Sequence, residues 1–550
     1  MFKISRTNKI ALHIFFGFLF FYLFSAPARL PDGDEAIMVG VGDRIVNFGF
    51  GEITSEGQER TKVFSSYGFY LSGYSKFGLG QSLLDIPIVG AYEKAKNYLQ
   101  TQSFSYYILV VYIVSISLAA GLNSLFFLCC EALGCKTTLA VCLSIILGST
   151  TSIWPYSQTL FADPALGFFW VLAFWSLLSF KSKFRKGWLV VAGLSTGFSV
   201  VLKTVALIPV FGFSVYFLFL IKQTVFNCNY TFGKLKRTYV IQSFFCFFLP
   251  IILLIGLILF YNSVRFNSWF SFGYSSNSID IRDIKYGFNV PVWLGLNGLL
   301  LSPGKGFFFY NSSALIGLLG WKVFYRKHQM EALLIGSIII SMIFIYSRWW
   351  AWHGDWAWGP RFLSGLAPFF LMAGGLWVQE NLGRLQAWNF RSALISICGV
   401  SLLVISFITQ TLGVSFKSEQ FIKTALKSFG GRYYHFSEWP IRDDLFIIHF
   451  VPEFSPLNGH LWMMKSKLYE KTSSFFEIYG NPPWALLNPV WKPNKVLESP
   501  FNFNVWWLNS WDKRYPGYGK NLFVAFLFMV VSLACFAGSI FYAYRIKSET

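Results

Sequence analysis

The strongest constraint in this sequence is a succession of apolar runs, each about as long as a membrane is thick. A helix needs ~20 residues to cross the hydrocarbon core of a bilayer. Only 13% of the residues are charged, against about 25% in soluble domains. The sequence therefore predicts an all-α polytopic membrane protein with about twelve transmembrane helices and both ends in the cytoplasm. The predicted spans are Ile10–Ala26, Tyr106–Cys130, Thr137–Trp154, Ala162–Phe180, Trp188–Leu202, Thr204–Ile221, Tyr239–Tyr261, Phe307–Gly320, Ala332–Tyr346, Phe362–Val378, Ser392–Leu412 and Asn521–Tyr544.

The basic residues set the orientation of these spans. The net charge of +20 would suggest a nucleic-acid partner in a soluble chain. Here Lys and Arg lie mostly in short loops between apolar runs, as expected for cytoplasmic loops, and we predict no nucleic-acid partner. Basic clusters both precede and follow the run 188–221, which must then cross outward and return. This topology leaves Lys203 at the outer turn.

The same topology leaves two long segments outside the membrane. Residues 29–105 form a large first outer loop within the transmembrane module 1–412. Residues 413–520 form an external segment, and residues 521–550 form the last helix and a cytoplasmic tail. Both segments would therefore lie on the outer side of the membrane.

Three shorter stretches have a local pattern of their own. Leu445–Val451 is typical of a strand and Leu457–Tyr469 of a helix, which predicts a small mixed segment at 413–520. Val290–Leu301 is apolar but too short to span a membrane, and it is better interpreted as re-entrant or interfacial.

Carboxylates gather on the predicted outer face. Asp32, Asp34 and Glu35 lie within four residues, where their mutual repulsion raises at least one pKa or favours a bound cation. Acids in the first turn of a helix are an equally good explanation of this pattern. Asp163 precedes Pro164 at the outer entrance of a predicted span, and its local pattern favours a helix N-cap with proline at the first position.

Cations from four loops share this face: Lys76, Lys203, Lys305 and Arg361. Arginine suits forked phosphate contacts, whereas lysine acts as a point charge. One such side chain could simply reach to the membrane interface. Four of them opposite two groups of acids predict an anion-binding site instead.

Aromatic residues cluster beside Arg361. Trp352, His353, Asp355 and Trp358 are candidates for contact with a sugar or an acceptor, although an interfacial aromatic belt explains the tryptophans more simply. Neither a P-loop nor an HExxH motif is present, and no histidine pair has metal-ligand spacing.

Six short motifs carry a resemblance that covers roughly Ile10 to Val378. They are GDEA at 33–36, YSKFGLGQSLLDIP at 74–87, WPYSQTLFADP at 154–164, Tyr261-Asn262 with Arg265-Phe266, LSPGKG at 301–306 and GPRF at 359–362. In order and in outer-face placement they resemble bacterial membrane glycosyltransferases of the GT-C fold. This group is related to protein O-mannosyltransferases and to the aminoarabinose transferase of lipid A.

The resemblance implies a polyprenyl-phosphate sugar donor and a periplasmic reaction. It implies Asp34, with Glu35 beside it, as the catalytic base or a metal-linked acid, and Asp163 as the second acid. It also implies that Lys76 and Arg361 hold the donor phosphate, although Phe77 follows Lys76 where relatives often have proline. Lys203 and Lys305 are additions made from charge and placement.

The residue types suit a single displacement with inversion. Cations stabilise a departing lipid phosphate, and a carboxylate accepts the proton of an acceptor hydroxyl on lipid, glycan or protein. A divalent metal between Asp34 and Asp163 is an open alternative without a histidine ligand. The main alternative function is a multi-pass transporter or flippase, whose site would lie near the midplane on broken helices. A phosphoethanolamine transferase or an assembly scaffold fits less well, and the sequence leaves the sugar open.

Overall fold

The structure is a computed structural model, and ten stretches of the chain are described below. They are residues 5–48, 75–101, 104–227, 233–272, 287–354, 356–387, 389–428, 448–468, 501–513 and 517–547. In these stretches nine helical segments are long and apolar enough to cross a membrane. The helices that form them are α1 (Arg6–Phe24), α5 (Phe104–Ala132), α8 (Ala162–Lys183), α10 (Leu207–Asn227), α11 (Gly233–Phe266), α15 (Gln329–Arg348), α16 (Ala367–Gln386), α17 (Phe390–Ser415) and α23 (Tyr518–Lys547).

The other three predicted spans are short or interrupted. The helices α6 (Thr137–Thr150) and α9 (Gly187–Leu202) have 14 and 16 residues. The predicted span Phe307–Gly320 is not one helix, because it divides into α13 (Phe307–Tyr310), η4 (Ser312–Ala314) and α14 (Leu315–Lys327). The all-helical membrane fold is confirmed, whereas the count of twelve spans stays a prediction.

Polar side chains hold the interruption between α13 and η4. The Asn311 side chain accepts a hydrogen bond from the backbone N–H of Ser152 at 2.7 Å and donates one to the Phe307 carbonyl at 3.1 Å. Gln410 of α17 donates to the Tyr310 carbonyl at 2.5 Å. The broken backbone is therefore satisfied by protein groups, as an irregular segment inside a membrane requires.

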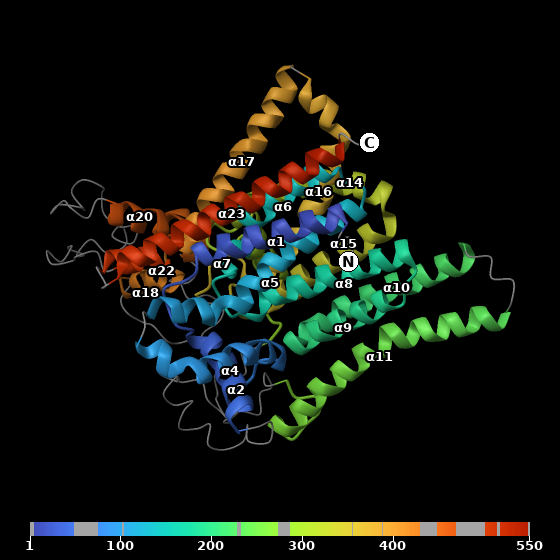
Figure 1. The fold of residues 1–550 in the computed structure, drawn as a ribbon, viewed down its shortest axis with the longest axis horizontal. Helices are drawn as coiled ribbons and strands as arrows, with labels where there is room; N and C mark the ends of the chain where they lie inside the picture. The colour runs from blue at the N-terminus through green and yellow to red at the C-terminus, as the bar shows by residue number, and fades with distance from the viewer. Residues whose placement is uncertain are drawn as a thin grey trace.

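Most of the long helices run roughly along one axis, and the helices of the two predicted outer segments gather at one end of the bundle, toward the left of Figure 1. Two of them come from the first predicted outer loop, α2 (Gly33–Phe48) and α4 (Leu79–Thr101). The segment before α23 contributes α18 (Ser418–Ser428), η6 (Pro452–Phe454), α20 (Pro456–Leu468) and α22 (Trp506–Asp512). These short elements surround the end of the bundle where the candidate site lies.

The predicted helix Leu457–Tyr469 is confirmed by α20 as far as Leu468. The predicted strand Leu445–Val451 is wrong in its described part, since residues 448–450 are helical and pack under the 301–306 loop. Residues 445–447 lie outside the described stretches. Within those stretches the extended pairing is one isolated bridge, Pro27 with Val505. The apolar stretch near residue 290 forms the 10-residue helix α12 (Val292–Leu301).

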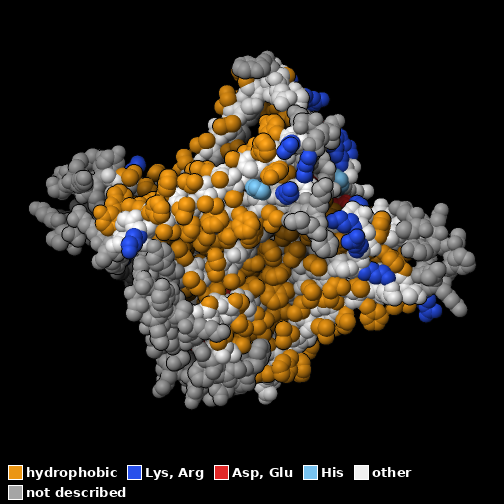
Figure 2. All heavy atoms as spheres, viewed as in Figure 1, with side chains coloured by type: hydrophobic (Ala, Val, Ile, Leu, Met, Phe, Trp, Pro, Cys, Tyr) orange, Lys and Arg blue, Asp and Glu red, His pale blue; other side chains and the backbone are white. Residues whose placement is uncertain are grey.

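The surface of the bundle suits a lipid environment. A wide band of apolar side chains covers the middle of the face in Figure 2, and most of the visible Lys and Arg lie toward its right-hand end. Large exposed apolar residues include Phe245 and Ile252 on α11, Ile397 on α17 and Phe526 on α23. Apolar surface of this extent is buried by partners or by membrane.

Candidate functional site

Four chain segments meet at the crowded end of the bundle and bring two acids together with two cations. Arg361, the first residue of the 3₁₀ helix η5 (Arg361–Leu366), lies at the centre. Its Nη1 donates to Asp34 Oδ2 at 3.0 Å and its Nε donates to Asp163 Oδ2 at 3.1 Å. Lys203 Nζ donates to Asp163 Oδ1 at 2.5 Å. We call these four residues the acid–base cluster.

Each member comes from the end of a helical element. Asp34 lies in the first turn of α2, Asp163 in the first turn of α8, and Lys203 directly after α9. The N-cap interpretation of Asp163 is wrong, because Phe161 occupies the N-cap and the Asp163 carboxylate contacts two cations instead. A close glycine contact brings α8 and η5 together here, since a Cβ on Gly167 would lie 2.9 Å from the Gly365 Cα.

Burial divides the two acids into different roles. The Asp163 side chain is 2% exposed and both its oxygens bond to cations, so it anchors Lys203 and Arg361. The Asp34 side chain is 32% exposed. Burial lowers the pKa of Lys203, and the Asp163 carboxylate acts in the opposite direction. Asp34 is thus the carboxylate of this cluster that a substrate hydroxyl can reach.

Aromatic rings form one wall of the cluster. The Arg361 guanidinium carbon lies 3.6 Å from the centre of the Phe161 ring, and Lys203 Nζ lies 4.7 Å from that of Phe362. The Phe362 ring stacks in turn on Tyr346, with centroids 4.5 Å apart. Cations over aromatic faces are attracted by the ring quadrupole, which adds to their fixed positions.

The loop that carries Lys76 is pressed against the end of α9, next to Lys203. A Cβ on Gly78 would lie 2.4 Å from the Leu202 carbonyl oxygen, and one on Gly80 would lie 2.7 Å from the Leu202 backbone nitrogen. Two glycines are therefore required for this approach. The Lys76 side chain is exposed, and its Nζ lies 5.5 Å from the centre of the Phe77 ring.

Arg265, in the last turn of α11, holds this loop from the other side. Its Nη1 donates to the carbonyls of Ser75 and Phe77, at 2.5 and 2.8 Å, which flank Lys76. Its Nη2 donates to Asn262 Oδ1 at 2.6 Å. Arg265 entered the sequence motifs without a role of its own. An arginine three residues after an asparagine, at the end of an apolar run, was the available signal.

Two predicted site residues point elsewhere. Glu35 is 1% exposed and is bonded by Arg29 rather than by any member of the acid–base cluster. Lys305 is buried, and its Nζ donates to the Ala357 carbonyl at 2.6 Å. Lys305 thus holds the chain that leads to Arg361, and a direct contact of Lys305 with a phosphate stays a prediction.

The predicted aromatic contacts are mostly buried in the protein. Trp352 packs on the Gly298 backbone of α12, and the Trp358 carbonyl accepts a hydrogen bond from Tyr156 at 2.6 Å. The His353 ring stacks on His449, with centroids 5.1 Å apart. Burial lowers the pKa of His353 to about 3 and that of His449 well below its usual value, so both rings are neutral at pH 7.

Contact of these aromatic side chains with a sugar stays a prediction. Asp355 lies outside the described stretches.

The two acids do not fit a divalent metal between them. Arg361 lies between Asp34 and Asp163 and bonds to both, so its positive charge occupies the place that a metal would take. Among the described residues, no group of three or more His, Cys, Asp or Glu has an arrangement suited to a metal.

Comparison with known proteins finds likeness in structure and none in sequence. No family model matches the chain, and no curated protein matches it significantly in sequence. Among solved structures, the chain is similar to ArnT from Cupriavidus metallidurans bound to undecaprenyl phosphate, with 13% identity and a TM-score of 0.40. The match covers 77% of this chain and 70% of that one.

Proposed function

We propose that this protein transfers a sugar from a polyprenyl-phosphate donor to an acceptor hydroxyl on the periplasmic face of a bacterial inner membrane. The observation that carries the proposal is the acid–base cluster, in which Asp34 is open to solvent and is held by a buried arginine. Lys203 and the Lys76 loop lie beside it. A reachable base next to fixed cations is the arrangement that this transfer needs.

Each residue has a distinct part in the proposed reaction. Asp34 accepts the proton of the acceptor hydroxyl, whose oxygen attacks the anomeric carbon. The bond from that carbon to the phosphate oxygen breaks, and the polyprenyl phosphate leaves with the electron pair. Lys76 and Lys203 face the negative charge that develops on the phosphate, whereas Arg361 holds Asp34 in place. One base and one leaving group give inversion at the anomeric carbon.

The distribution of charge supports the proposed orientation. Basic residues at the ends of α8, α14 and α16 lie opposite the acid–base cluster, among them Lys183, Arg326 and Arg384. Cytoplasmic loops carry the excess of Lys and Arg, so the cluster would face the periplasm. A donor with a long isoprenoid tail would reach it from the bilayer, and the acceptor would reach it from the aqueous side.

The transporter or flippase is a second candidate because of one observation, the interruption at Asn311. Broken helices near the midplane are typical of transporter sites. The hydrogen bonds of Asn311 to Ser152 and Phe307 already satisfy polar groups at this interruption, however, and this favours the transferase.

The test is sugar transfer by the purified protein in detergent, with a panel of radiolabelled polyprenyl-phosphate sugars and membrane-extract acceptors. The variant Asp34→Asn keeps the size of the side chain and removes the base. Glu453→Gln, an exposed acid of η6, is the matched control. We expect transfer by the wild type and the control, and loss in a folded Asp34→Asn protein. Equal transfer by Asp34→Asn would reject the base. Absence of transfer with every donor, combined with substrate uptake in proteoliposomes, would favour the transporter.

A further inference from the structure

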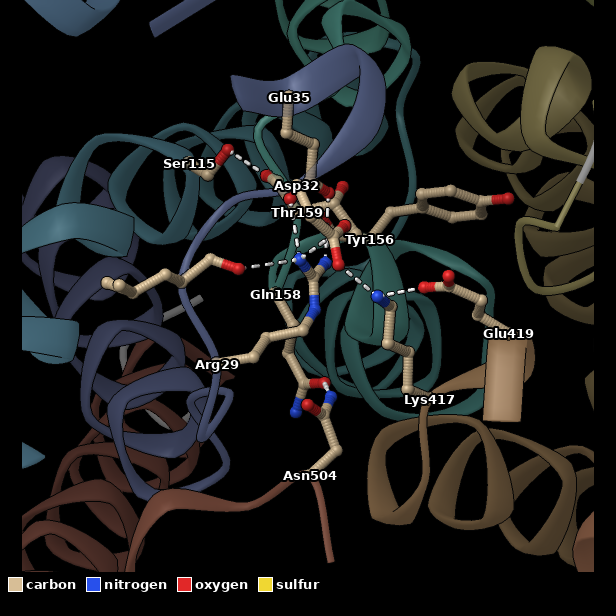
Figure 3. A network of polar contacts seen from close by, with 11 residues as sticks. Arg29, Asp32, Glu35, Ser115, Tyr156, Gln158, Thr159, Lys417, Glu419 and Asn504 are labelled. Atoms are coloured by element: carbon tan, nitrogen blue, oxygen red, sulfur yellow. Dashed lines mark hydrogen bonds and ion pairs between the residues drawn. The ribbon is translucent and has the colours of Figure 1, made fainter. Parts of the chain in front are cut away.

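A second ionic network, drawn in Figure 3, shares the first turn of α2 with the acid–base cluster. Arg29 forms a forked pair with Glu35, from Nη1 to Oε2 at 2.8 Å and from Nη2 to Oε1 at 3.0 Å. The Glu35 side chain is almost completely buried. A forked pair of this kind fixes direction as well as distance. It therefore fixes how the first turn of α2 is rotated.

Asp32 connects this turn to the segment before α23. Its carbonyl accepts the backbone N–H groups of Glu35 and Ala36, at 3.1 and 3.4 Å, where α2 begins. Its carboxylate accepts a hydrogen bond from Lys417, which also bonds to Glu419 in the first turn of α18. Figure 3 shows Lys417 reaching between the two carboxylates from one side of the network.

Asn504 ties the same parts of the chain together through the backbone. Its carbonyl accepts from the N–H of Ala28 at 2.6 Å, and its N–H donates to the carbonyl of Ser415 at 2.7 Å. Its side chain donates to Gln158 at 3.1 Å. Asn504 thus braces the residue before Arg29 and a residue two positions before Lys417.

We propose that Arg29 and Lys417 are positioning residues that aim Asp34 at the reaction centre, and that this is a role of the segment 413–520. Successive residues of an α-helix point about 100° apart. With Glu35 fixed inward by Arg29, Asp34 is turned toward Arg361. Lys417 fixes the start of the same turn through Asp32. The inference rests on the proposed function, in which Asp34 is the base.

The pair of Lys417 and Asp32 can be tested without loss of the fold. Their side chains are 23% and 53% exposed, and ion pairs this exposed contribute little to stability. Loss of the pair between Lys417 and Asp32 should therefore alter the placement of α2 and leave the melting temperature nearly unchanged. The buried pair of Arg29 and Glu35 is more sensitive, and Arg29→Lys, which keeps the charge and loses the fork, is the mild variant.

The experiment is a charge-reversal cycle on the full-length protein in detergent. Lys417→Asp and Asp32→Lys each remove the attraction, and the double variant restores it with the charges exchanged. All variants carry Glu419→Gln, because Lys417→Asp would otherwise place a second carboxylate against Glu419. We expect each single variant to lower kcat about tenfold, because small misplacements of a base are costly, with little change in donor KM. The double variant should recover part of the loss, since Asp32→Lys also brings a positive charge near Arg29. Lys465→Asp, on the exposed side of α20, makes the same charge change in the same segment and should have no effect.

Hydrogen exchange of the amides of residues 33–42 gives a readout independent of activity. Exchange should be faster in both single variants and in Arg29→Lys, and should return toward the wild-type rate in the double variant. If the wild type transfers no sugar, the proposed function fails, while exchange still decides whether the network holds α2. Unchanged kcat and unchanged exchange in the single variants would overturn the proposal. So would a loss seen in KM alone, or a double variant as defective as the single ones.

Discussion

The helix α8 carries a buried ionic network at each of its ends. Asp163 in its first turn bonds to Lys203 and Arg361. Lys181 near its last turn donates to Glu331 Oε1 at 2.7 Å, and Tyr216 donates to the same oxygen at 2.7 Å. Eighteen residues separate the two ends, or about 27 Å along the helix. One helix therefore joins two charge clusters that lie on opposite sides of the predicted membrane.

The two networks differ in which member solvent reaches. In the first network the residue with the most exposed side chain is an acid, Asp34, which bonds to Arg361. In the second network the acid, Glu331, is buried, and the exposed residue is a cation, Lys181, whose side chain is 38% exposed. Buried charges are paired in both, as their desolvation demands. Burial of an ion pair therefore does not by itself distinguish a functional site from a structural one. The two networks differ in whether their exposed residue is an acid or a cation.

After loss of the base itself, the substitution with the largest expected effect on transfer is Arg361→Gln. It removes the group that holds Asp34 in place, and misplacement of a catalytic group by about 1 Å can cost about 10²-fold in rate. Transfer assays on folded protein measure this loss. The same substitution leaves Asp163 with Lys203 alone, so the melting temperature should also fall. Retention of full kcat by Arg361→Gln would place the chemistry outside the acid–base cluster.

The sequence indicated which residues gather at this site better than it indicated where their side chains point. Asp34, Asp163, Lys203 and Arg361 were all predicted, because each follows or begins an apolar run at the same predicted face. Glu35 was grouped with Asp34 as a neighbour in the sequence, yet adjacent helical residues point about 100° apart. Its buried partner, Arg29, appears only in the tertiary structure.

The fold shows the same limit. The long spans were predictable because a bilayer demands long apolar helices. The break within residues 307–320 was not predictable, because it depends on a hydrogen bond between the Asn311 side chain and the backbone N–H of Ser152, which is distant in the sequence. The strand pattern at 445–451 reflects apolar spacing in a short stretch, which does not separate a strand from a buried helix.

The second prediction concerns Arg265→Lys. This substitution weakens the bonds that hold the Lys76 loop and leaves the acid–base cluster unchanged, so it separates the effects of the two. A lysine keeps the charge but is shorter and has a single nitrogen, so it cannot bond to Asn262 and to both carbonyls that flank Lys76 in the geometry of the guanidinium. Net hydrogen bonds to a charged group contribute about 1.5–3 kcal/mol, so donor KM should rise about tenfold or more. Steady-state kinetics with varied donor concentration measures this. A fall in kcat at unchanged donor KM would contradict a role in holding the donor phosphate.

The third prediction tests the other end of α8. Glu331→Gln removes the acid of the second network and leaves Lys181 hydrated, so stability should fall by about 1–3 kcal/mol. Transfer per folded molecule should not change, because this network lies far from Asp34. Thermal unfolding in detergent and transfer at a temperature well below the transition give the two values. A matched loss of transfer in the folded variant would show that the ends of α8 are coupled.

The last prediction adds another buried acid, Asp85 of α4, which has an amide partner rather than a cation. Gln81 Nε2 donates to Asp85 Oδ1 at 3.0 Å, and burial raises the pKa of Asp85 from 3.8 to about 8. A folded pKa above the unfolded one gives stability that is complete below pH 3.8 and is lost as the pH rises through about 8. Across that window one proton changes the free energy of unfolding by up to about 1.4 kcal/mol per pH unit.

Asp85→Asn should therefore flatten the dependence of unfolding on pH between about 5 and 8, while transfer at one fixed pH stays close to that of the wild type. Chemical unfolding in detergent at several pH values measures the slope. An equally steep slope in the variant would mean that other groups carry the dependence. A flattened slope would mean that a buried acid without a cation stays protonated, whereas Asp163 and Glu331 are each paired with a cation.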